Sequence, residues 1–336
     1  MTSKLTVILY HYDASPFATK VKNMLLLKGI PHKRVDVAMT LPRPEITDLL
    51  GVKYRRIPIL AIDNDVYCDT NLIANVLERR FPPSQGYETL FPPRIGSQKA
   101  DTGLAKALTI YWNDKIVFPL AGNSLPYGRL GAKLIADRSE WSGAPIVPER
   151  MEAGQGKRTS TISSHLSLIE EQLSDGREWL LDTVQPGLVD IDIHFVHDWL
   201  RTFRSVRELY DPAEVPKTLD WLSRVKAFVK EREQRKVAAF EVISGDDAAK
   251  SITSASYEDP QIVGFVDAEA KRLGVKLGDT VSVMPVDTGK IPTLGRLISL
   301  NREELAIEVS GSVGVIRLHF PRLEYSVALS KVESKL

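Results

Sequence analysis

Thr6-Val7-Ile8-Leu9-Tyr10, followed by Ser15-Pro16-Phe17, is the most informative part of this sequence. The first run is apolar and typical of a buried strand, and residues 16–28 form an amphipathic pattern that predicts a helix ending at Gly29. Ser15 stands at the junction, beside the unpaired N–H groups and the positive end of the helix dipole. A hydroxyl in this position can stabilise a thiolate, either the protein's own or one brought by a ligand.

An ordinary helix start explains the same residues equally well. Serine is a favoured N-cap, proline is favoured at the first helical position, and glycine is favoured just past the last turn. Two further motifs downstream favour the ligand-binding interpretation.

The first of these motifs is Arg55-Arg56-Ile57-Pro58-Ile59-Leu60, which opens an apolar, β-branched strand over residues 57–62. Proline belongs at the start of a strand because it cannot donate to the ladder. If the Ile57–Pro58 bond is cis, the backbone of Ile57 turns outward and can pair with an extended peptide ligand. A trans proline that merely starts a strand is the competing interpretation.

The second motif is Tyr67-Cys68-Asp69-Thr70, which precedes a predicted helix over residues 71–80. Asp69 and Thr70 take the cap and first-turn positions, where free N–H groups can bind a carboxylate. Capping alone is again the competing explanation.

Together, the motifs resemble the thioredoxin-like N-terminal domain of glutathione transferases. Ser15-Pro16-Phe17-Ala18-Thr19-Lys20-Val21-Lys22 is similar to the Ser-Pro-Phe signature of the serine-type tau class, and to the Cys-Pro-Phe-Ala signature of the omega class with Ser in place of Cys. Arg56-Ile57-Pro58 resembles the Lys-Ile-Pro or Gln-Val-Pro element, and Cys68-Asp69-Thr70 resembles the Cys-Glu-Ser element. The resemblance is strongest to fungal transferase-like proteins with long C-terminal extensions.

The resemblance implies an α/β thioredoxin-like glutathione-binding domain over residues 1–92 and an all-helical substrate-side domain over residues 93–245. Helical patterns over residues 98–118, 161–173, 191–207 and 216–235 agree with the second domain. Asp190 lies in the stretch that matches the box starting the family's central helix, and we expect it to be structural. His194 and His197 lie three residues apart, but no further ligands converge on them, so no metal site is expected.

A glutathione site follows from the same resemblance. Its implied catalytic residue is Ser15, and its implied glutathione-binding residues are Phe17, Arg56, Ile57, Pro58, Asp69 and Thr70. A free thiol has a pKa of about 8.5, and a hydroxyl donor at a helix N-terminus lowers it. Ser15 would donate to the sulfur, and Asp69 and Thr70 would hold the ammonium and carboxylate of the γ-glutamyl end.

The implied function is a glutathione transferase-like enzyme, with glutathione as cosubstrate and no metal. It would use the thiolate to attack a small hydrophobic electrophile beside Tyr111, Trp112 and Phe118, for which simple packing is the alternative. Two other functions stay open, a glutathione-dependent isomerase and a non-catalytic protein that binds a ligand or partner. Ser in place of Cys argues against thiol transfer, because serine cannot form a mixed disulfide. The resemblance also implies a homodimer.

Composition limits the number of domains, the binding partners and the cellular compartment that can be expected. The chain has 336 residues, too many for one compact module, and 44 lysines and arginines balance 43 aspartates and glutamates. This balance argues against binding to nucleic acid or to a membrane surface through bulk charge. The single cysteine, Cys68, excludes an internal disulfide and fits the reducing cytoplasm. No apolar run approaches the length of a spanning helix or a signal peptide.

Residues 246–336 lie outside the resemblance. Apolar and polar residues alternate there from Val281, Leu305, Ile316 and Leu323 onward, which predicts four or five short strands in a small, barrel-like antiparallel module. A sheet this small cannot bury its apolar face alone, so we expect it to dock on the helical domain or a second subunit. A free linker over residues 244–256 is the competing interpretation.

Overall fold

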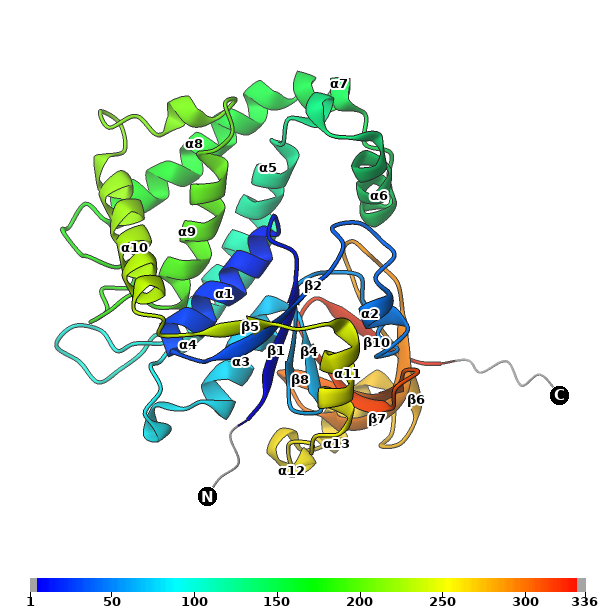
Figure 1. Cartoon of the computed structure of the whole chain (residues 1–336). Coiled ribbons are helices and arrows are strands. Elements are labelled where there is room, and N and C mark those ends of the chain that lie inside the picture. Colours follow the sequence, from blue (N-terminus) through cyan, green and yellow to red (C-terminus); the bar gives the residue numbers. More distant parts are fainter. Residues whose placement is uncertain (1–4, 331–336) are drawn as a thin grey trace.

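The computed structural model of this chain describes residues 5–330. A ten-stranded sheet runs through it, and a group of helices lies on one side of the N-terminal part of that sheet (Figure 1). None of the helices in this described part is both long and apolar enough to cross a membrane.

The N-terminal region has the element order expected from its motifs. Its elements are β1 (Val7–His11), α1 (Pro16–Lys28), β2 (His32–Asp36), α2 (Pro44–Thr47), β3 (Ile59–Ile62), β4 (Asp65–Cys68) and α3 (Thr70–Arg80). Strand β1 runs parallel to β2 and antiparallel to β3, and β3 pairs antiparallel with β4. The predicted thioredoxin-like α/β region is therefore confirmed.

Helix α1 has the bounds that its local signals predict. The Ser15 Oγ accepts the backbone N–H of Ala18 at 3.2 Å, and Pro16 takes the first helical position. Gly29 ends the helix in the left-handed region, with φ of 69°, where a side chain would be disfavoured. The inward face of α1, with Val21, packs on the sheet, so capping and burial act together to place Ser15 at the end of β1.

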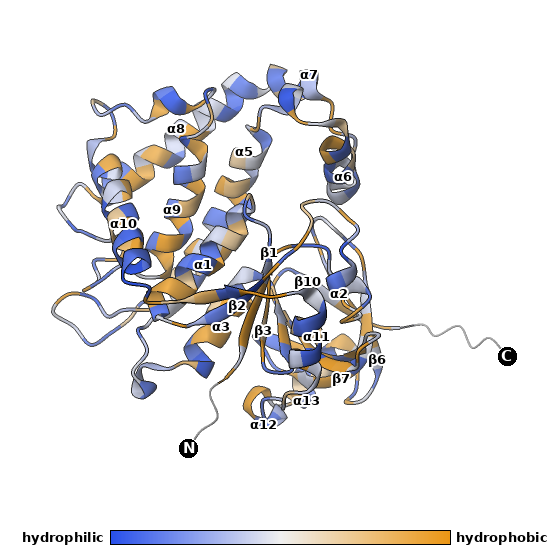
Figure 2. Ribbon diagram, in the orientation of Figure 1, coloured by the Kyte–Doolittle hydropathy of each residue, from blue (hydrophilic) through white to orange (hydrophobic). Residues whose placement is uncertain are grey.

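The middle of the chain is helical, as expected. Its elements are η1 (Pro83–Gln85), α4 (Thr102–Ala107), the π-helical η2 (Leu108–Val117), α5 (Phe118–Asn123), η3 (Tyr127–Arg129), α6 (Ala132–Ser142), α7 (Pro148–Ala153), α8 (Gln155–Gln172), α9 (Leu188–Leu200), η4 (Arg207–Leu209) and α10 (Pro216–Gln234). Figure 2 shows hydrophobic residues concentrated in the strands and in α9, whereas α6 and α7 carry more hydrophilic residues.

Asp190 has the structural role expected of it. Its carboxylate accepts the N–H groups of Gly187 and Leu180, each at 3.0 Å, and the indole N–H of Trp221 at 2.9 Å. These contacts tie the start of α9 to α10 and to the preceding loop. The predicted helix over residues 191–207 ends earlier, at Leu200, where the chain enters turns before η4.

The rest of the chain returns to the sheet. Strand β5 (Phe240–Val242) pairs parallel with β2, and the following residues form α11 (Gly245–Thr253), α12 (Pro260–Val263), α13 (Asp267–Leu273), β6 (Thr280–Pro285), β7 (Thr293–Leu300), β8 (Glu304–Ser310), β9 (Val315–Pro321) and β10 (Tyr325–Leu329). We call residues 245–330 the C-terminal module. Strands β6–β10 pair antiparallel, as predicted. The complete sheet has the order β10-β6-β7-β8-β9-β4-β3-β1-β2-β5.

The C-terminal module contacts the helical region, as expected, but it also joins the N-terminal sheet, which was not expected. Strand β9 adds to the outer edge of β4, in a parallel pair with Tyr67 opposite His319. The segment considered as a linker forms α11, whose Ala248, Ala249 and Ile252 are buried in the same core as β3 and β9. Apolar strand faces from both ends of the chain therefore share one core, and the module is no free appendage.

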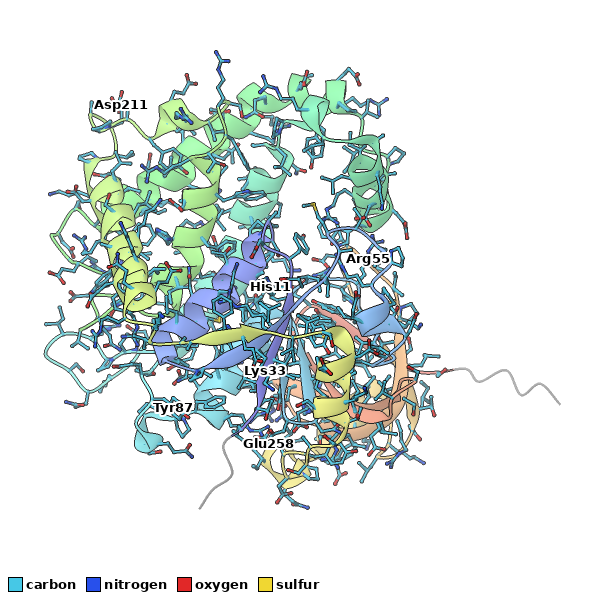
Figure 3. The ribbon with its side chains drawn as sticks, viewed as in Figure 1. His11, Lys33, Arg55, Tyr87, Asp211 and Glu258 are labelled. Atoms are coloured by element: carbon cyan, nitrogen blue, oxygen red, sulfur yellow. The ribbon has the colours of Figure 1, made fainter. Side chains whose placement is uncertain are left out.

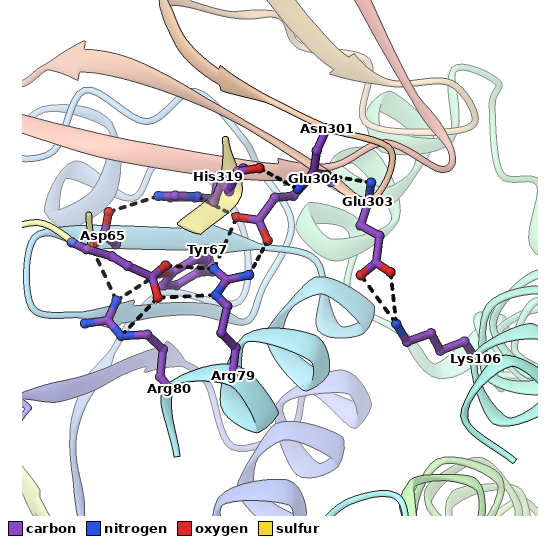
Figure 4. Close-up of polar contacts among 11 residues, drawn as sticks. Asp65, Tyr67, Arg79, Arg80, Lys106, Asn301, Glu303, Glu304 and His319 are labelled. Carbon is purple, nitrogen blue, oxygen red and sulfur yellow. Dashed lines mark hydrogen bonds and ion pairs between the residues drawn. The ribbon is translucent and has the colours of Figure 1, made fainter. Parts of the chain in front are cut away.

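Two arginine side chains of α3 stabilise the junction with the C-terminal module through ion pairs (Figure 4). Arg79 pairs with Glu258 at 2.8 Å and with Glu304 at 2.7 Å. Arg80 lies 3.4 Å from Asp65, whose carboxylate also accepts the N–H of Glu258 at 2.6 Å. Because the carboxylates are buried and each has several donors, removing one partner would leave an uncompensated charge.

His319 lies inside this network, between two carboxylates (Figure 4). Its Nε2 is 3.0 Å from Asp65 and its Nδ1 is 3.1 Å from Glu304. Burial disfavours the charged ring, but the two carboxylates outweigh it and raise the pKa of His319. Burial likewise opposes ionisation of Glu304, yet His319 and Arg79 lower the pKa of Glu304 to about 2.

This arrangement predicts how stability depends on pH. A histidine whose pKa is higher in the folded state stabilises fully below its unfolded pKa of about 6.5, and the stabilisation is lost as pH rises through the folded pKa. His319→Gln should therefore lower the unfolding midpoint more near pH 6 than near pH 9. His197→Gln is the matched control, since burial lowers the pKa of His197 to about 3 and keeps it neutral throughout. A pH-independent loss for His319→Gln would contradict the charged state.

Candidate glutathione-binding site

The three sequence motifs meet at one edge of the sheet. Tyr10 lies opposite Ile59, and Ile59 lies opposite Cys68, so these residues are in register across β1, β3 and β4. Ser15 follows the end of β1, Pro58 immediately precedes β3, and Asp69 immediately follows β4. Because all three positions lie just beyond the same end of neighbouring strands, the fold brings together residues that are up to 54 positions apart in the sequence.

Ser15 has a hydroxyl that can donate a hydrogen bond. Its side chain is buried, its N–H donates to the carbonyl of Tyr12 at 3.0 Å, and its Oγ accepts from Ala18. A hydroxyl that accepts one bond from the backbone keeps its own O–H for another acceptor. Capping and donation to a ligand are therefore compatible in Ser15, and the same helix end supplies the positive end of the α1 dipole.

The Ile57–Pro58 bond is cis. Neither the N–H nor the carbonyl of Ile57 pairs with another group within residues 5–330, and Pro58 is buried. The preceding Arg56 is half-buried, and its Nε is buried with no hydrogen-bond partner in the same part of the chain. This corner therefore offers a backbone donor, a backbone acceptor and a cationic donor, as an extended peptide with a carboxylate requires.

Asp69 and Thr70 begin α3. Asp69 has φ of 76° and accepts the N–H of Asn71 at 2.9 Å, as an N-cap does. Thr70 is buried at the first helical position, next to the orphan N–H groups of the first turn. The second carboxylate oxygen of Asp69 accepts the hydroxyl of Tyr325 at 3.2 Å, so a strand of the C-terminal module reaches this end of the site.

The aromatic candidates lie in different environments. The ring of Phe17 lies 4.3 Å from that of Phe118 and 5.5 Å from that of Phe195, so it packs toward the helices. Trp112 donates its indole N–H to His165 at 3.1 Å, and Tyr111 is 46% exposed. Phe118 alone of the three acceptor-pocket candidates contacts Phe17, the residue two positions after Ser15.

A buried ionic cluster lies behind Ser15, and sequence reasoning missed it. Lys20 of α1 is fully buried, with its Nζ 2.5 Å from Asp192, 3.1 Å from Asp114 and 3.4 Å from the amide oxygen of Asn71. Burial disfavours the charge, but the two aspartates outweigh it and raise the pKa of Lys20. Burial raises the pKa of Asp192 to about 8 against the opposing effect of Lys20.

The signal for this cluster lies in α9. Asp192 interrupts the apolar run Leu188-Val-Asp-Ile-Asp-Ile-His-Phe-Val196, and a charge in the middle of a buried helix requires a partner. The cluster connects α1, α3, η2 and α9, which holds Ser15 and Thr70 in fixed positions relative to each other. Burial raises the pKa of Cys68, so its thiol packs as a small hydrophobe.

Helix α6 and a loop of the C-terminal module flank the cis-proline corner. Arg55 pairs with Asp137 of α6 at 3.1 Å and with Glu140 at 3.2 Å, and Figure 3 shows it beside that helix. In the loop between β6 and β7, the N–H of Gly289 donates to the carbonyl of Trp141 at 2.8 Å. The candidate site is therefore bordered by three regions of the chain.

The comparisons with known proteins agree with this geometry. Residues 9–85 match the family described as the N-terminal domain of glutathione S-transferase, and residues 124–234 match a domain of unknown function (DUF7962). No curated protein matches the sequence.

Solved structures extend the likeness. A GST-like protein from Pseudomonas syringae is 26% identical, covers 97% of this chain and 99% of its own length, and has a TM-score of 0.66. A tau class glutathione S-transferase from mango, Mangifera indica, is 18% identical over 69% of this chain and 96% of its own, with a TM-score of 0.50. A rice glutathione S-transferase in complex with glutathione is 16% identical over 75% of this chain and 96% of its own, also at 0.50.

The mango and rice structures show the fold alone, whereas the bacterial protein matches nearly the whole chain, including the region of β6–β10. The likeness to fungal proteins expected from the motifs stays a prediction. The chain thus matches the family of glutathione S-transferase N-terminal domains over residues 9–85 and is similar over almost all of its length to a GST-like protein.

Proposed function

We propose that this chain is a glutathione transferase-like enzyme that activates the thiol of glutathione as a thiolate. The observation that supports this most directly is the meeting of Ser15, the free backbone of Ile57 beside cis Pro58, and Asp69 at one edge of the sheet. Each of these groups matches a different part of a tripeptide thiol. The proposal includes a small hydrophobic electrophile as second substrate and a homodimer as the working form.

In this mechanism the chain binds and orients the cosubstrate. The backbone N–H and carbonyl of Ile57 pair with the cysteinyl residue, which sets the sulfur beside the N-terminus of α1. Ser15 donates its O–H to the sulfur, and the helix dipole adds a favourable potential, so the thiol loses its proton to solvent near neutral pH. The sulfur then forms a bond to the electrophilic carbon, and the leaving group departs with the electron pair of the broken bond.

The γ-glutamyl end binds away from the reacting atom. Asp69 receives the ammonium, and Thr70 with the first turn of α3 receives the carboxylate. At the other end of the peptide, the unpartnered Nε of Arg56 is a donor for the glycyl carboxylate. These contacts are equal in the ground state and the transition state, so they serve binding more than chemistry.

A calorimetric titration with glutathione, followed by turnover with an activated aryl chloride, tests the proposal. Binding in the micromolar to millimolar range together with glutathione-dependent loss of the chloride would support a transferase. Recovery of free glutathione after turnover of a substrate would identify an isomerase. Absence of binding would leave a transferase-like protein that binds another ligand or partner.

Replacing Asp69 separates binding from chemistry. Asp69→Ala should raise the KM for glutathione by roughly tenfold or more, while kcat falls far less, because the ammonium lies away from the sulfur. Asp63→Ala is a matched control, since Asp63 is also an aspartate with positive φ, at the turn between β3 and β4. Equal losses in kcat and kcat/KM for Asp69→Ala would show that the residue acts in the transition state or holds the fold.

A further inference from the structure

Two side chains of the candidate site are held by the C-terminal module. Asp69 contacts Tyr325 of β10, and Arg56 contacts Asp287 and Thr288 of the loop between β6 and β7. These module residues lie more than 200 positions away in the sequence from the residues that they contact. They belong to the region that the match to the glutathione S-transferase N-terminal domain does not include.

Tyr325 restricts the carboxylate of Asp69. The Tyr325 hydroxyl donates to one oxygen of Asp69 at 3.2 Å, while the N–H of Asn71 donates to the other at 2.9 Å. The Tyr325 hydroxyl also lies 3.1 Å from that of Tyr54, and both rings are buried against Phe320. The carboxylate is therefore fixed from both sides in one orientation, by a hydroxyl that is itself held in a packed core.

The loop between β6 and β7 restricts Arg56. One terminal nitrogen of the Arg56 guanidinium donates to the Asp287 carboxylate and to the Thr288 carbonyl. Asp287 in turn pairs with Lys115 of η2 at 2.8 Å, and Lys115 also pairs with Glu324 at 3.0 Å. This terminal nitrogen is thus anchored, and the Nε, buried beside it on the same edge of the guanidinium, has no partner within residues 5–330.

Docking alone does not account for these contacts. The module is already attached by the β4–β9 pairing and by the network around His319, both at the β4 edge of the sheet. A further ion pair between the module and the helical region joins Lys106 to Glu303 at 3.4 Å, and it contacts no site residue. Tyr325 and Asp287 differ from these docking contacts because each contacts a residue that binds glutathione in the proposed function.

We propose that the C-terminal module positions two residues of the glutathione site. Tyr325 positions Asp69 for the ligand's ammonium, and Asp287 positions Arg56 for its glycyl carboxylate. The inference rests on the proposed function. An anchored side chain loses less conformational entropy when the ligand binds, so both residues should improve affinity without touching the ligand.

Truncated ligands test each half of the proposal. Tyr325→Phe should weaken glutathione binding by roughly threefold to tenfold, and it should leave binding of N-acetylglutathione, which has no ammonium, nearly unchanged. Asp287→Ala should weaken glutathione binding to a similar extent and leave binding of γ-glutamylcysteine, which has no glycyl carboxylate, nearly unchanged. Calorimetry gives the dissociation constants, and thermal unfolding checks that each variant is folded.

Matched variants show whether the effects are local. Tyr54→Phe removes the other hydroxyl of the buried pair, which makes no direct contact with Asp69. Glu303→Ala removes the ion pair with Lys106, which contacts no site residue. Neither should change the dissociation constants by more than about twofold. A merely structural role of the module would weaken binding of all three ligands by the same factor.

The outcomes distinguish this inference from the function on which it rests. If the unaltered chain binds no glutathione, both are overturned. Suppose that it binds glutathione, and that the two variants either keep the dissociation constants of all ligands or raise them by the same factor. The proposed function then stands, and the positioning role of the module is overturned. Tighter binding of glutathione by Asp287→Ala would also overturn it, because Asp287 would then compete with the ligand's carboxylate for Arg56.

Discussion

Ser15→Ala should lower glutathione-dependent turnover by roughly tenfold to a hundredfold, the loss expected when a donor worth about 1.5–3 kcal/mol to a charged acceptor is removed. The serine hydroxyl is buried beside the α1 N-terminus, and in the proposed mechanism it donates to the sulfur while its oxygen accepts from Ala18. The loss should appear in kcat/KM, and the pKa seen in the pH–rate profile should move upward, because the thiolate of bound glutathione loses its donor.

Stability should fall by only about 1 kcal/mol, the usual cost of losing an N-cap. Ser244→Ala is the matched control, since the Ser244 hydroxyl caps α11 by accepting the N–H of Asp247 at 3.1 Å. That variant should lose the same stability and keep full activity, and Ser15→Thr should retain part of the activity. Unchanged turnover in Ser15→Ala would reduce Ser15 to a cap and make Tyr12 the next candidate donor.

Lys20→Met should destabilise the fold by about 3–5 kcal/mol, the cost of leaving buried carboxylates without their cation. Asp192 is fully buried and Asp114 nearly so, and Lys20 is the cation that contacts both. Protonation would relieve the uncompensated charge, and burial already raises the pKa of both carboxyls. The loss of stability should therefore be smaller near pH 5 than near pH 8, measured by denaturant unfolding at each pH.

Lys28→Met is the matched control for this prediction, because Lys28 is equally buried on the same helix. Its partner Glu78, at 2.7 Å, also accepts from Thr89 and the N–H of Leu90 and is partly exposed. Glu78 therefore keeps other donors, and the loss should be clearly smaller than for Lys20→Met. Adding Asp192→Asn to Lys20→Met should restore part of the stability, and failure of that rescue would contradict an electrostatic origin.

Local signals made the N-terminal region predictable. Ser15, Pro16 and Gly29 act within a few residues of where they stand, so the bounds of α1 could be predicted from the sequence alone. The alternation of apolar and polar residues from Val281 onward predicted β-structure for the same reason. Asp69 as a helix cap belongs to the same class of local signal.

Contacts between distant segments were not predictable in this way. Lys20 appears in the sequence as one polar residue of an amphipathic helix, and only the placement of α9 against α1 makes it a buried cation. Tyr325 and Asp287 lie in a module whose docking surface depends on an edge pairing, β4 with β9, that no local pattern encodes. The expected contact with the helical region is present, but the pairing with β4 was not predicted for that reason.

The β4–β9 pairing also has a consequence for synthesis of the chain. Asp65 and its partner His319 are 254 residues apart in the sequence, so the outer edge of β4 leaves the ribosome long before the strand that covers it. At typical rates of about 5–20 residues per second, that edge stays uncovered for roughly ten to fifty seconds. An uncovered strand edge templates aggregation, so the nascent chain is most exposed to misassembly, and most dependent on chaperones, during this interval.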